Sequence, residues 1–123
     1  MTYDKCYAFA LRVVRAYQFL SQEKREFILS KQLLRCGTSI GANVAEANGA
    51  ISNADFSAKI SISYKECLET KYWLNLLHDT DYLEDKVFKS LLKDADELAK
   101  ILFSILRSTR SMKLPATPAN SNE

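Results

Sequence analysis

Apolar residues recur along this chain at the three- and four-residue intervals of an α-helix, and no stretch alternates strictly as a strand would. In the first segment, at about residues 3–20, the pattern passes through Tyr3, Tyr7, Ala10, Val14 and Tyr17. A second segment is expected to begin after Ser21, a residue suited to cap a helix, and to end at Asn48 and Gly49. Both segments predict helices.

The second half of the chain predicts two further helices. Ser52, followed three residues later by Asp55, is the pattern of a capping box that opens a helix. The seam of this helix then passes through Phe56, Ile60, Ser63, Cys67, Thr70, Leu74 and Leu77. A polar cluster at residues 79–85 marks a turn, and the fourth helix frays near Arg110 after passing through Phe88, Leu91, Ala95, Leu98, Leu102 and Ile105.

Long helices joined by short connections pack antiparallel. We therefore expect an all-α, up-down antiparallel four-helix bundle over residues 1–112. A disordered tail is expected over residues 113–123, which contain both prolines of the chain and no apolar period. Gly37 and Gly41 lie inside the second helix, where glycine costs ~1 kcal/mol, so they predict the close approach of a neighbouring backbone.

Two of the predicted helices carry more apolar surface than a single bundle buries. The third helix has apolar residues on both flanks of its seam, with Ile62, Trp73 and Leu76 on one flank and Tyr64, Leu68 and Tyr72 on the other. On the first helix the polar arc is narrow and basic, and its residues Lys5, Arg12 and Arg15 are expected to face solvent. We expect a homo-oligomer, with Ile62, Trp73 and Leu76 of the third helix at its interface.

The composition is that of one ordinary soluble domain, with 123 residues of which 47% are hydrophobic and 26% charged. No apolar run approaches the ~20 residues that cross a bilayer, and no secretory signal is visible, so a cytoplasmic protein without a membrane span is expected. The cysteines Cys6, Cys36 and Cys67 are odd in number and widely spaced. This spacing favours buried reduced thiols over a disulfide framework.

The formal net charge of +2 conceals basic ends and an acidic middle, at residues 37–98. Such a distribution permits an anionic partner, although ordinary solubility explains it equally well. The candidate nucleic-acid contacts are basic residues of the first two helices and of the end of the fourth, namely Lys5, Arg12, Arg15, Lys24, Arg25, Lys31, Arg35, Arg107 and Arg110.

Little in the sequence supports catalysis or a bound metal. His78 is the only histidine, no nucleophile motif stands near it, and the scattered cysteines lack the paired spacing of a zinc site. Glu66 and Glu69 share a helix face and would suit an acid/base pair, although a salt-bridged face is the favoured interpretation. We expect no enzymatic activity, no cofactor and no metal.

A polar pair in the second helix, Asn43 and Glu46, lies one turn apart beside the apolar position Val44. Such a pair is either solvated or fixes the register of a helix contact, and we favour the second interpretation. The same stretch carries the most specific motif of the chain.

This motif is the run Ser39-Ile40-Gly41-Ala42-Asn43-Val44-Ala45-Glu46-Ala47, followed by Ser52, Asp55 and Phe56 and then by Lys65-Glu66-Cys67-Leu68-Glu69. Over about residues 3–110 the chain thereby resembles the four-helix bundle protein family, also called 23S rRNA intervening-sequence proteins. Its signature and packing positions here are Ser39, Gly41, Asn43 and Glu46. More distantly, the chain is similar to the accessory protein of diversity-generating retroelements, which works with a reverse transcriptase and RNA.

The resemblance implies a bundle assembled as a ring of five, with nucleic-acid binding proposed and no established enzymatic activity. Many members have glycine where Ala47 stands and an arginine shortly after it, where this chain reads Asn48-Gly49-Ala50-Ile51. A contact made by that arginine would be missing here. The hypothesis is a non-enzymatic homopentamer that binds structured RNA or DNA through basic outer faces, and the alternative is a scaffold for another protein without nucleic-acid contact.

Overall fold

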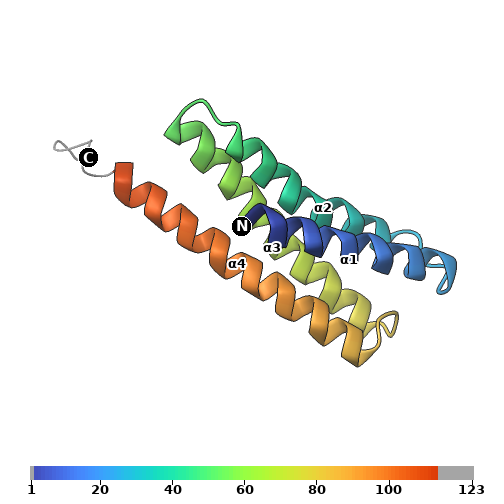
Figure 1. Ribbon diagram of the computed structural model, residues 1–123. Helices are drawn as coiled ribbons and strands as arrows, with labels where there is room; N and C mark the ends of the chain where they lie inside the picture. Colours follow the sequence, from blue (N-terminus) through green and yellow to red (C-terminus); the bar gives the residue numbers. More distant parts are fainter. Residues whose placement is uncertain (1, 114–123) are drawn as a thin grey trace.

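The computed structural model describes residues 2–113, with side chains described for residues 2–109, and it consists of helices joined by short connections. The helices are α1 (Thr2–Gln22), α2 (Leu29–Asn48), α3 (Asn53–Asp79) and α4 (Asp85–Lys113). Consecutive helices run antiparallel (Figure 1), and no strand occurs among residues 2–113. The predicted all-α class is confirmed. No helix in this part of the chain combines the length and the apolar character of a membrane span.

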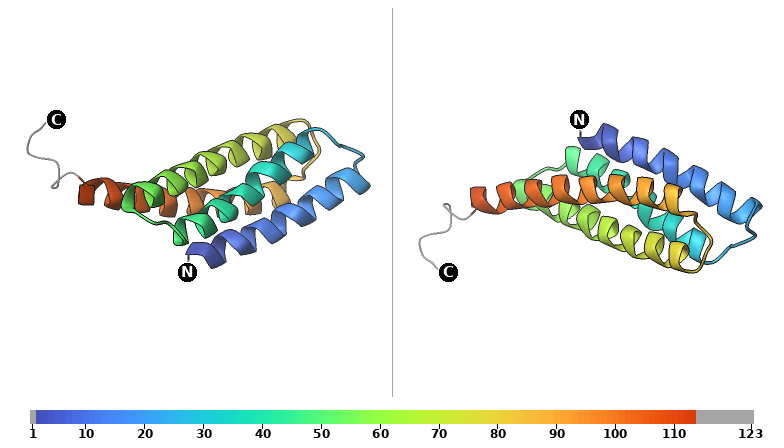
Figure 2. Two further views of the ribbon diagram at one scale, coloured as in Figure 1. Left: turned by 90° about the horizontal axis from the view of Figure 1, so that it is seen from above. Right: turned by 90° about the horizontal axis from the view of Figure 1, so that it is seen from below.

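Each helix packs against the next one along the chain, and α4 closes the bundle against α1. The α2–α3 pair has the most extensive contact and the α1–α4 pair the sparsest. In Figure 1, α1 and α4 draw apart toward the C-terminal end of α1. Figure 2 shows that the C-terminal end of α4 extends beyond the other three helices. The bundle is therefore least closed along the seam between α1 and α4.

The core is formed by the apolar seams of all four helices. Its fully buried members include Leu20, Leu33, Ile40, Leu74 and Leu102. Cys6, Cys36 and Cys67 are buried and free, which confirms the prediction for the cysteines. Burial raises the pKa of Cys6 and Cys36 to about 11 and that of Cys67 to about 12, so the thiols stay protonated near neutral pH.

The predicted close approach to the second helix is confirmed, and its partner is α1. Gly37 and Gly41 are both buried, and the nearest atoms that a side chain would meet belong to Val13 and Cys6 of α1. Since the two glycines have no side chain, the α1 and α2 backbones lie closer than larger residues would permit.

The start of α3 was predicted correctly and the start of α2 was not. Ser52 caps α3, and its Oγ accepts a hydrogen bond from the Asp55 backbone N–H at 3.0 Å. Ser21 does not cap α2, because it lies inside α1, where its hydroxyl donates to the Tyr17 carbonyl at 2.8 Å. The second helix begins only at Leu29.

The N-cap position of α2 is Ile28, but the side chain that caps the helix belongs to Glu26, a buried acidic residue that is only 8% exposed. Its carboxylate accepts the backbone N–H groups of Ile28, Leu29 and Ser30 at 3.1, 2.9 and 2.7 Å. Burial alone would raise the pKa of Glu26, but the three backbone hydrogen bonds outweigh it and lower the pKa. A charged carboxylate at this position satisfies helix N–H groups that otherwise lack a partner.

At the other end of the chain, α4 continues through Lys113, one residue past the boundary predicted for the bundle. The remainder of the predicted disordered tail, residues 114–123, lies outside the described residues.

Candidate nucleic-acid interface

The basic residues expected to contact nucleic acid fall into two groups. Those of the first group form an ion pair with a described residue, and those of the second do not. On α1, Lys5 pairs with Glu97 of α4 at 2.7 Å and Arg12 pairs with Asp94 at 2.6 Å. The Arg12 guanidinium also donates to Ser90 Oγ at 2.9 Å. The hydrogen bond from Lys5 lowers the pKa of Glu97. Two of the three residues expected to face solvent thus link α1 to α4, because acidic residues from the far end of the sequence lie opposite them.

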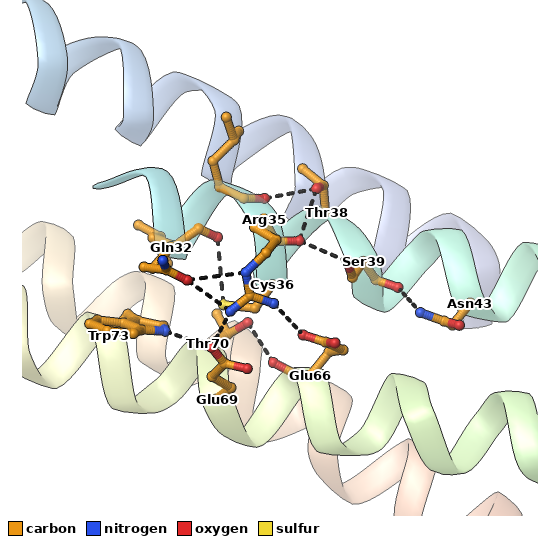
Figure 3. A network of polar contacts seen from close by, with 12 residues as sticks. Gln32, Arg35, Cys36, Thr38, Ser39, Asn43, Glu66, Glu69, Thr70 and Trp73 are labelled. Atoms are coloured by element: carbon orange, nitrogen blue, oxygen red, sulfur yellow. Dashed lines mark hydrogen bonds and ion pairs between the residues drawn. The ribbon is translucent and has the colours of Figure 1, made fainter. Parts of the chain in front are cut away.

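Arg35 of α2 lies in a polar network with α3 (Figure 3). Its guanidinium donates to Gln32 Oε1 at 3.0 and 3.1 Å and pairs with Glu66 at 3.4 Å. It also pairs with Glu69, whose carboxylate accepts a hydrogen bond from Trp73 Nε1 at 2.9 Å. The Trp73 hydrogen bond is the main cause of the lowered pKa of Glu69, and Arg35 adds to it. The interpretation of Glu66 and Glu69 as a salt-bridged face is confirmed.

Most of the polar signature positions of α2 hydrogen-bond within their own helix. Ser39 Oγ donates to the Arg35 carbonyl at 2.8 Å, and Asn43 Nδ2 donates to the Ser39 carbonyl at 2.8 Å. Glu46 instead pairs with Lys59 of α3 at 2.8 Å. Of the predicted Asn43–Glu46 register pair, only Glu46 reaches another helix.

Several of the expected contacts are cations of α1, of α2 and of the connection between them, and they form no ion pair with a described residue. They are Arg15, Lys24, Arg25 and Lys31. Two of them lie over exposed aromatic rings, with Lys24 Nζ 6.0 Å from the Phe19 ring centre and Arg25 Cζ 5.6 Å from that of Phe27. Cations interleaved with exposed aromatic rings suit nucleotides, which present both phosphates and flat bases.

A second set of four such cations lies on α4, and of these only Arg107 was predicted from the sequence. It consists of Lys86, Lys93, Lys100 and Arg107, here called the α4 stripe. All four are exposed, and none forms an ion pair with a described residue. Residues seven apart return to within about 20° of the same face of a helix, so the stripe follows the outside of α4 with a slow drift around it. Arg110, predicted beside Arg107, lies on α4 with its side chain outside the described set.

Acidic residues flank the α4 stripe, but the neighbouring helices pair with them. Glu97 is held by Lys5 of α1, and Asp96 pairs with Lys71 of α3 at 2.7 Å. Glu97 lies one turn from both Lys93 and Lys100, but its ion pair is with α1, and that of Asp96 is with α3, so neither carboxylate forms an ion pair with the α4 stripe.

Of the residues predicted at an oligomer interface, Ile62 is 42% exposed, whereas Trp73 and Leu76 are half-buried. Trp73 packs against the core and is bonded to Glu69. The candidate interface therefore offers less apolar surface than its sequence suggested.

Two other apolar faces are more exposed. The α1 face is formed by Tyr3, Tyr7 and Leu11, on the side of the helix away from Lys5 and Arg12. The α3–α4 face is formed by Leu68, Tyr72 and Phe103, with the half-buried Tyr64 ring 5.8 Å from that of Phe103. These two faces belong to different sides of the bundle.

The only histidine of the chain, His78, lies in the last turn of α3. His78 stacks on Phe88 at 4.1 Å between ring centres, and its Nε2 lies 2.9 Å from an oxygen of Asp85. Among the described residues, no three or more His, Cys, Asp or Glu side chains are grouped as metal ligands would be.

The antiparallel helices and their interhelical ion pairs define a four-helix bundle protein with a basic stripe along its last helix. The family model of the 23S rRNA-intervening sequence protein matches residues 1–104, and the chain belongs to that family. It is also similar to a solved structure, a protein of unknown function from the S23 ribosomal protein family of Bacteroides thetaiotaomicron. The two are 48% identical, the match covers 86% of this chain and 95% of that one, and the TM-score is 0.85.

No curated protein matches the chain. The family model and the solved structure together place the chain in a family that is named for 23S rRNA and is not a known enzyme family. They do not show the more distant similarity to the accessory protein of diversity-generating retroelements.

Proposed function

We propose that the protein binds structured RNA, in the first place a segment of 23S rRNA, through the α4 stripe. The observation that carries this proposal is the row of four exposed cations without ion pairs along the outside of one helix. The name of the family, which refers to 23S rRNA, indicates that the anion bound by these cations is RNA. In this role the protein acts by binding and catalyses no reaction, and it works where rRNA is made, in the bacterial cytoplasm.

The geometry of the α4 stripe fits a phosphate backbone. Seven residues of helix advance about 10 Å, so the stripe from Lys86 to Arg107 extends over about 30 Å. Double-stranded RNA is recognised mainly by its shape and its phosphates, because its deep major groove does not admit side chains. A rigid row of cations needs no base contacts to bind such a helix, and its lysines and arginine release counterions from the RNA.

The same proposal includes assembly into a homopentameric ring. The α1 face and the α3–α4 face are different surfaces on different sides of the bundle, and contact between unlike surfaces closes into a ring when the rotation fits. The number five follows from the family resemblance. A ring repeats the α4 stripe in every subunit, so that modest contacts add up to useful avidity.

The experiment compares two triple variants of equal charge by fluorescence anisotropy with a labelled 23S rRNA hairpin. Lys86→Gln with Lys93→Gln and Lys100→Gln removes most of the α4 stripe. The matched control, Lys31→Gln with Lys59→Gln and Lys65→Gln, removes three cations of α2 and α3 that lie away from α4 and carry no aromatic contact. We expect the first variant to bind at least about tenfold more weakly at low salt and the control to bind nearly as wild type.

Equal losses in both variants would mean that net charge, and not the α4 stripe, determines binding. If the wild-type protein binds no RNA at low salt, the proposal fails and the protein-scaffold alternative takes its place.

A further inference from the structure

A cleft opens between the C-terminal half of α1 and the turn that leads from α3 into α4, where these helices draw apart. Its volume is about 460 Å³, within the range of small-ligand sites. Apolar side chains form most of its lining, including Ala16 and Phe19 from α1 and Leu83, Val87 and Leu91 from the other wall. Tyr82 adds a second aromatic ring.

The cleft is held open by contacts on either side of it. At one end of the cleft, the lining residue Arg12 pairs with Asp94 and fixes the distance between α1 and α4. On the opposite wall the turn is fixed by backbone hydrogen bonds from Asp81 to His78 at 3.0 Å and from Tyr82 to Leu77 at 2.9 Å. Both walls are thus set before any ligand arrives, which lowers the entropic cost of binding.

Charges of opposite sign line the two walls without pairing with each other. Arg15 and Lys24 stand on the α1 side, and Asp81 and Glu84 stand on the side of the turn. None of the four forms an ion pair with a described residue. A ligand that satisfies both walls must therefore carry an anion at one end, N–H donors at the other, and a flat apolar body between them.

We propose that this cleft binds a guanine nucleotide, with the phosphate at Arg15 and Lys24 and the base against Phe19 and Tyr82. A carboxylate offers two acceptor oxygens and no donor. Guanine presents two adjacent N–H donors on its Watson–Crick edge, whereas adenine and cytosine each place a ring acceptor beside their amino group and uracil has a single donor. Unstacked bases in RNA loops are bound in this way, by aromatic stacking and hydrogen bonds to the base edge.

This inference deepens the proposed function and rests on it, because the nucleotide that enters the cleft is an unpaired guanosine in a loop of the bound RNA. The cleft uses none of the four residues of the α4 stripe, so the two sites can be tested apart. Free GMP has the same chemistry as the unpaired guanosine and serves as the probe.

The test is calorimetric titration of the full chain with GMP, AMP and UMP. We expect GMP to bind at least about tenfold more tightly than AMP or UMP. Neither of these presents two adjacent N–H donors, so a carboxylate of the cleft would lack hydrogen-bond partners. Glu84→Gln should weaken GMP binding about tenfold, and Val87→Trp should abolish it by filling the cleft from an exposed position. Thermal unfolding of both variants verifies that they fold.

The triple variant of the α4 stripe is the matched control and should bind GMP as wild type does. An absence of GMP binding, equal affinity for the three nucleotides, or unchanged binding in both cleft variants would each overturn the inference.

Two RNA hairpins that differ only by guanosine or adenosine in the loop then distinguish the sources of the nucleotide. We expect the guanosine hairpin to bind more tightly, and the difference to vanish in Val87→Trp. RNA binding through the α4 stripe without a guanosine preference would overturn the inference and leave the proposed function standing. GMP binding without any RNA binding would overturn the proposed function and identify the free nucleotide as the ligand.

Discussion

A Cβ atom placed on Gly37 of α2 would lie 2.8 Å from both Cγ atoms of Val13 on α1. Real Cβ atoms do not approach a neighbour this closely, so α1 and α2 take their present separation only because residue 37 has no side chain. Val13 is fully buried and belongs to the core, and it has little room to move away. The position of α1, and with it of Arg12 and the cleft, depends on this contact.

Gly37→Ala is expected to destabilise the fold by about 1 to 3 kcal/mol, since it overpacks a close helix contact. Gly41→Ala is the matched control, because its new Cβ would meet Cys6 Cβ at 3.4 Å, close to ordinary contact. There the gain in helix propensity, up to about 1 kcal/mol, offsets the crowding. Urea unfolding measures both variants.

Equal stability of the two alanine variants would contradict this account of the α1–α2 contact. Gly41→Leu, in contrast to Gly41→Ala, should damage folding or assembly, since a branched side chain does not fit opposite Cys6.

Glu26→Gln is expected to lower the free energy of unfolding by about 1 to 2 kcal/mol at neutral pH, because a neutral amide caps α2 more weakly than a carboxylate does. The pKa of Glu26 is lowered in the folded protein. Its stabilising effect is therefore present above the unfolded pKa, about 4.3, and is lost as the pH falls through the folded pKa.

The difference between wild type and Glu26→Gln should accordingly shrink in acid, and unfolding at several pH values measures it. Glu23→Gln, at a neighbouring exposed carboxylate, is the control and should change stability by less than about 0.5 kcal/mol. A difference that stays constant down to acidic pH would show that the charge of Glu26 does not stabilise α2.

Tyr7→Glu and Leu68→Glu are each expected to break the proposed ring, because each places a charge in one of its two unlike faces. Wild type should scatter light as about five copies of the 14.0 kDa chain, and each variant alone as a monomer. Since each variant keeps one intact face, a mixture of the two should form a one-to-one dimer.

A mixture that stays monomeric would show that the α1 face and the α3–α4 face do not bind each other. A monomeric wild type at micromolar concentration would contradict assembly altogether.

Much of the fold could be predicted from the chain because it is encoded locally. The intervals of three and four residues locate all four helices, and Ser52 with Asp55 correctly places the start of α3. The start of α2 was wrong by several residues. Ser21 has the composition of a cap, but it forms part of the preceding helix, and a buried glutamate in the loop caps α2 instead.

The surface was less predictable, because pairing between distant residues decides which charges stay free. Lys5 and Arg12 are neutralised by Glu97 and Asp94, which lie far along the sequence and become neighbours only when α4 closes the bundle. The seven-residue spacing from Lys86 to Arg107 could have been found from the sequence. Its lack of ion pairs could not, since that depends on the side to which Glu97 and Asp96 turn.

The most direct test of RNA binding through the α4 stripe is the salt dependence of affinity for the 23S rRNA hairpin. The logarithm of the association constant should fall linearly with the logarithm of salt concentration. In the Lys86→Gln, Lys93→Gln and Lys100→Gln variant the slope should flatten by about one unit for each lysine that contacts a phosphate, while the control variant keeps the wild-type slope. A stripe variant with the wild-type affinity and the wild-type slope would contradict the claim.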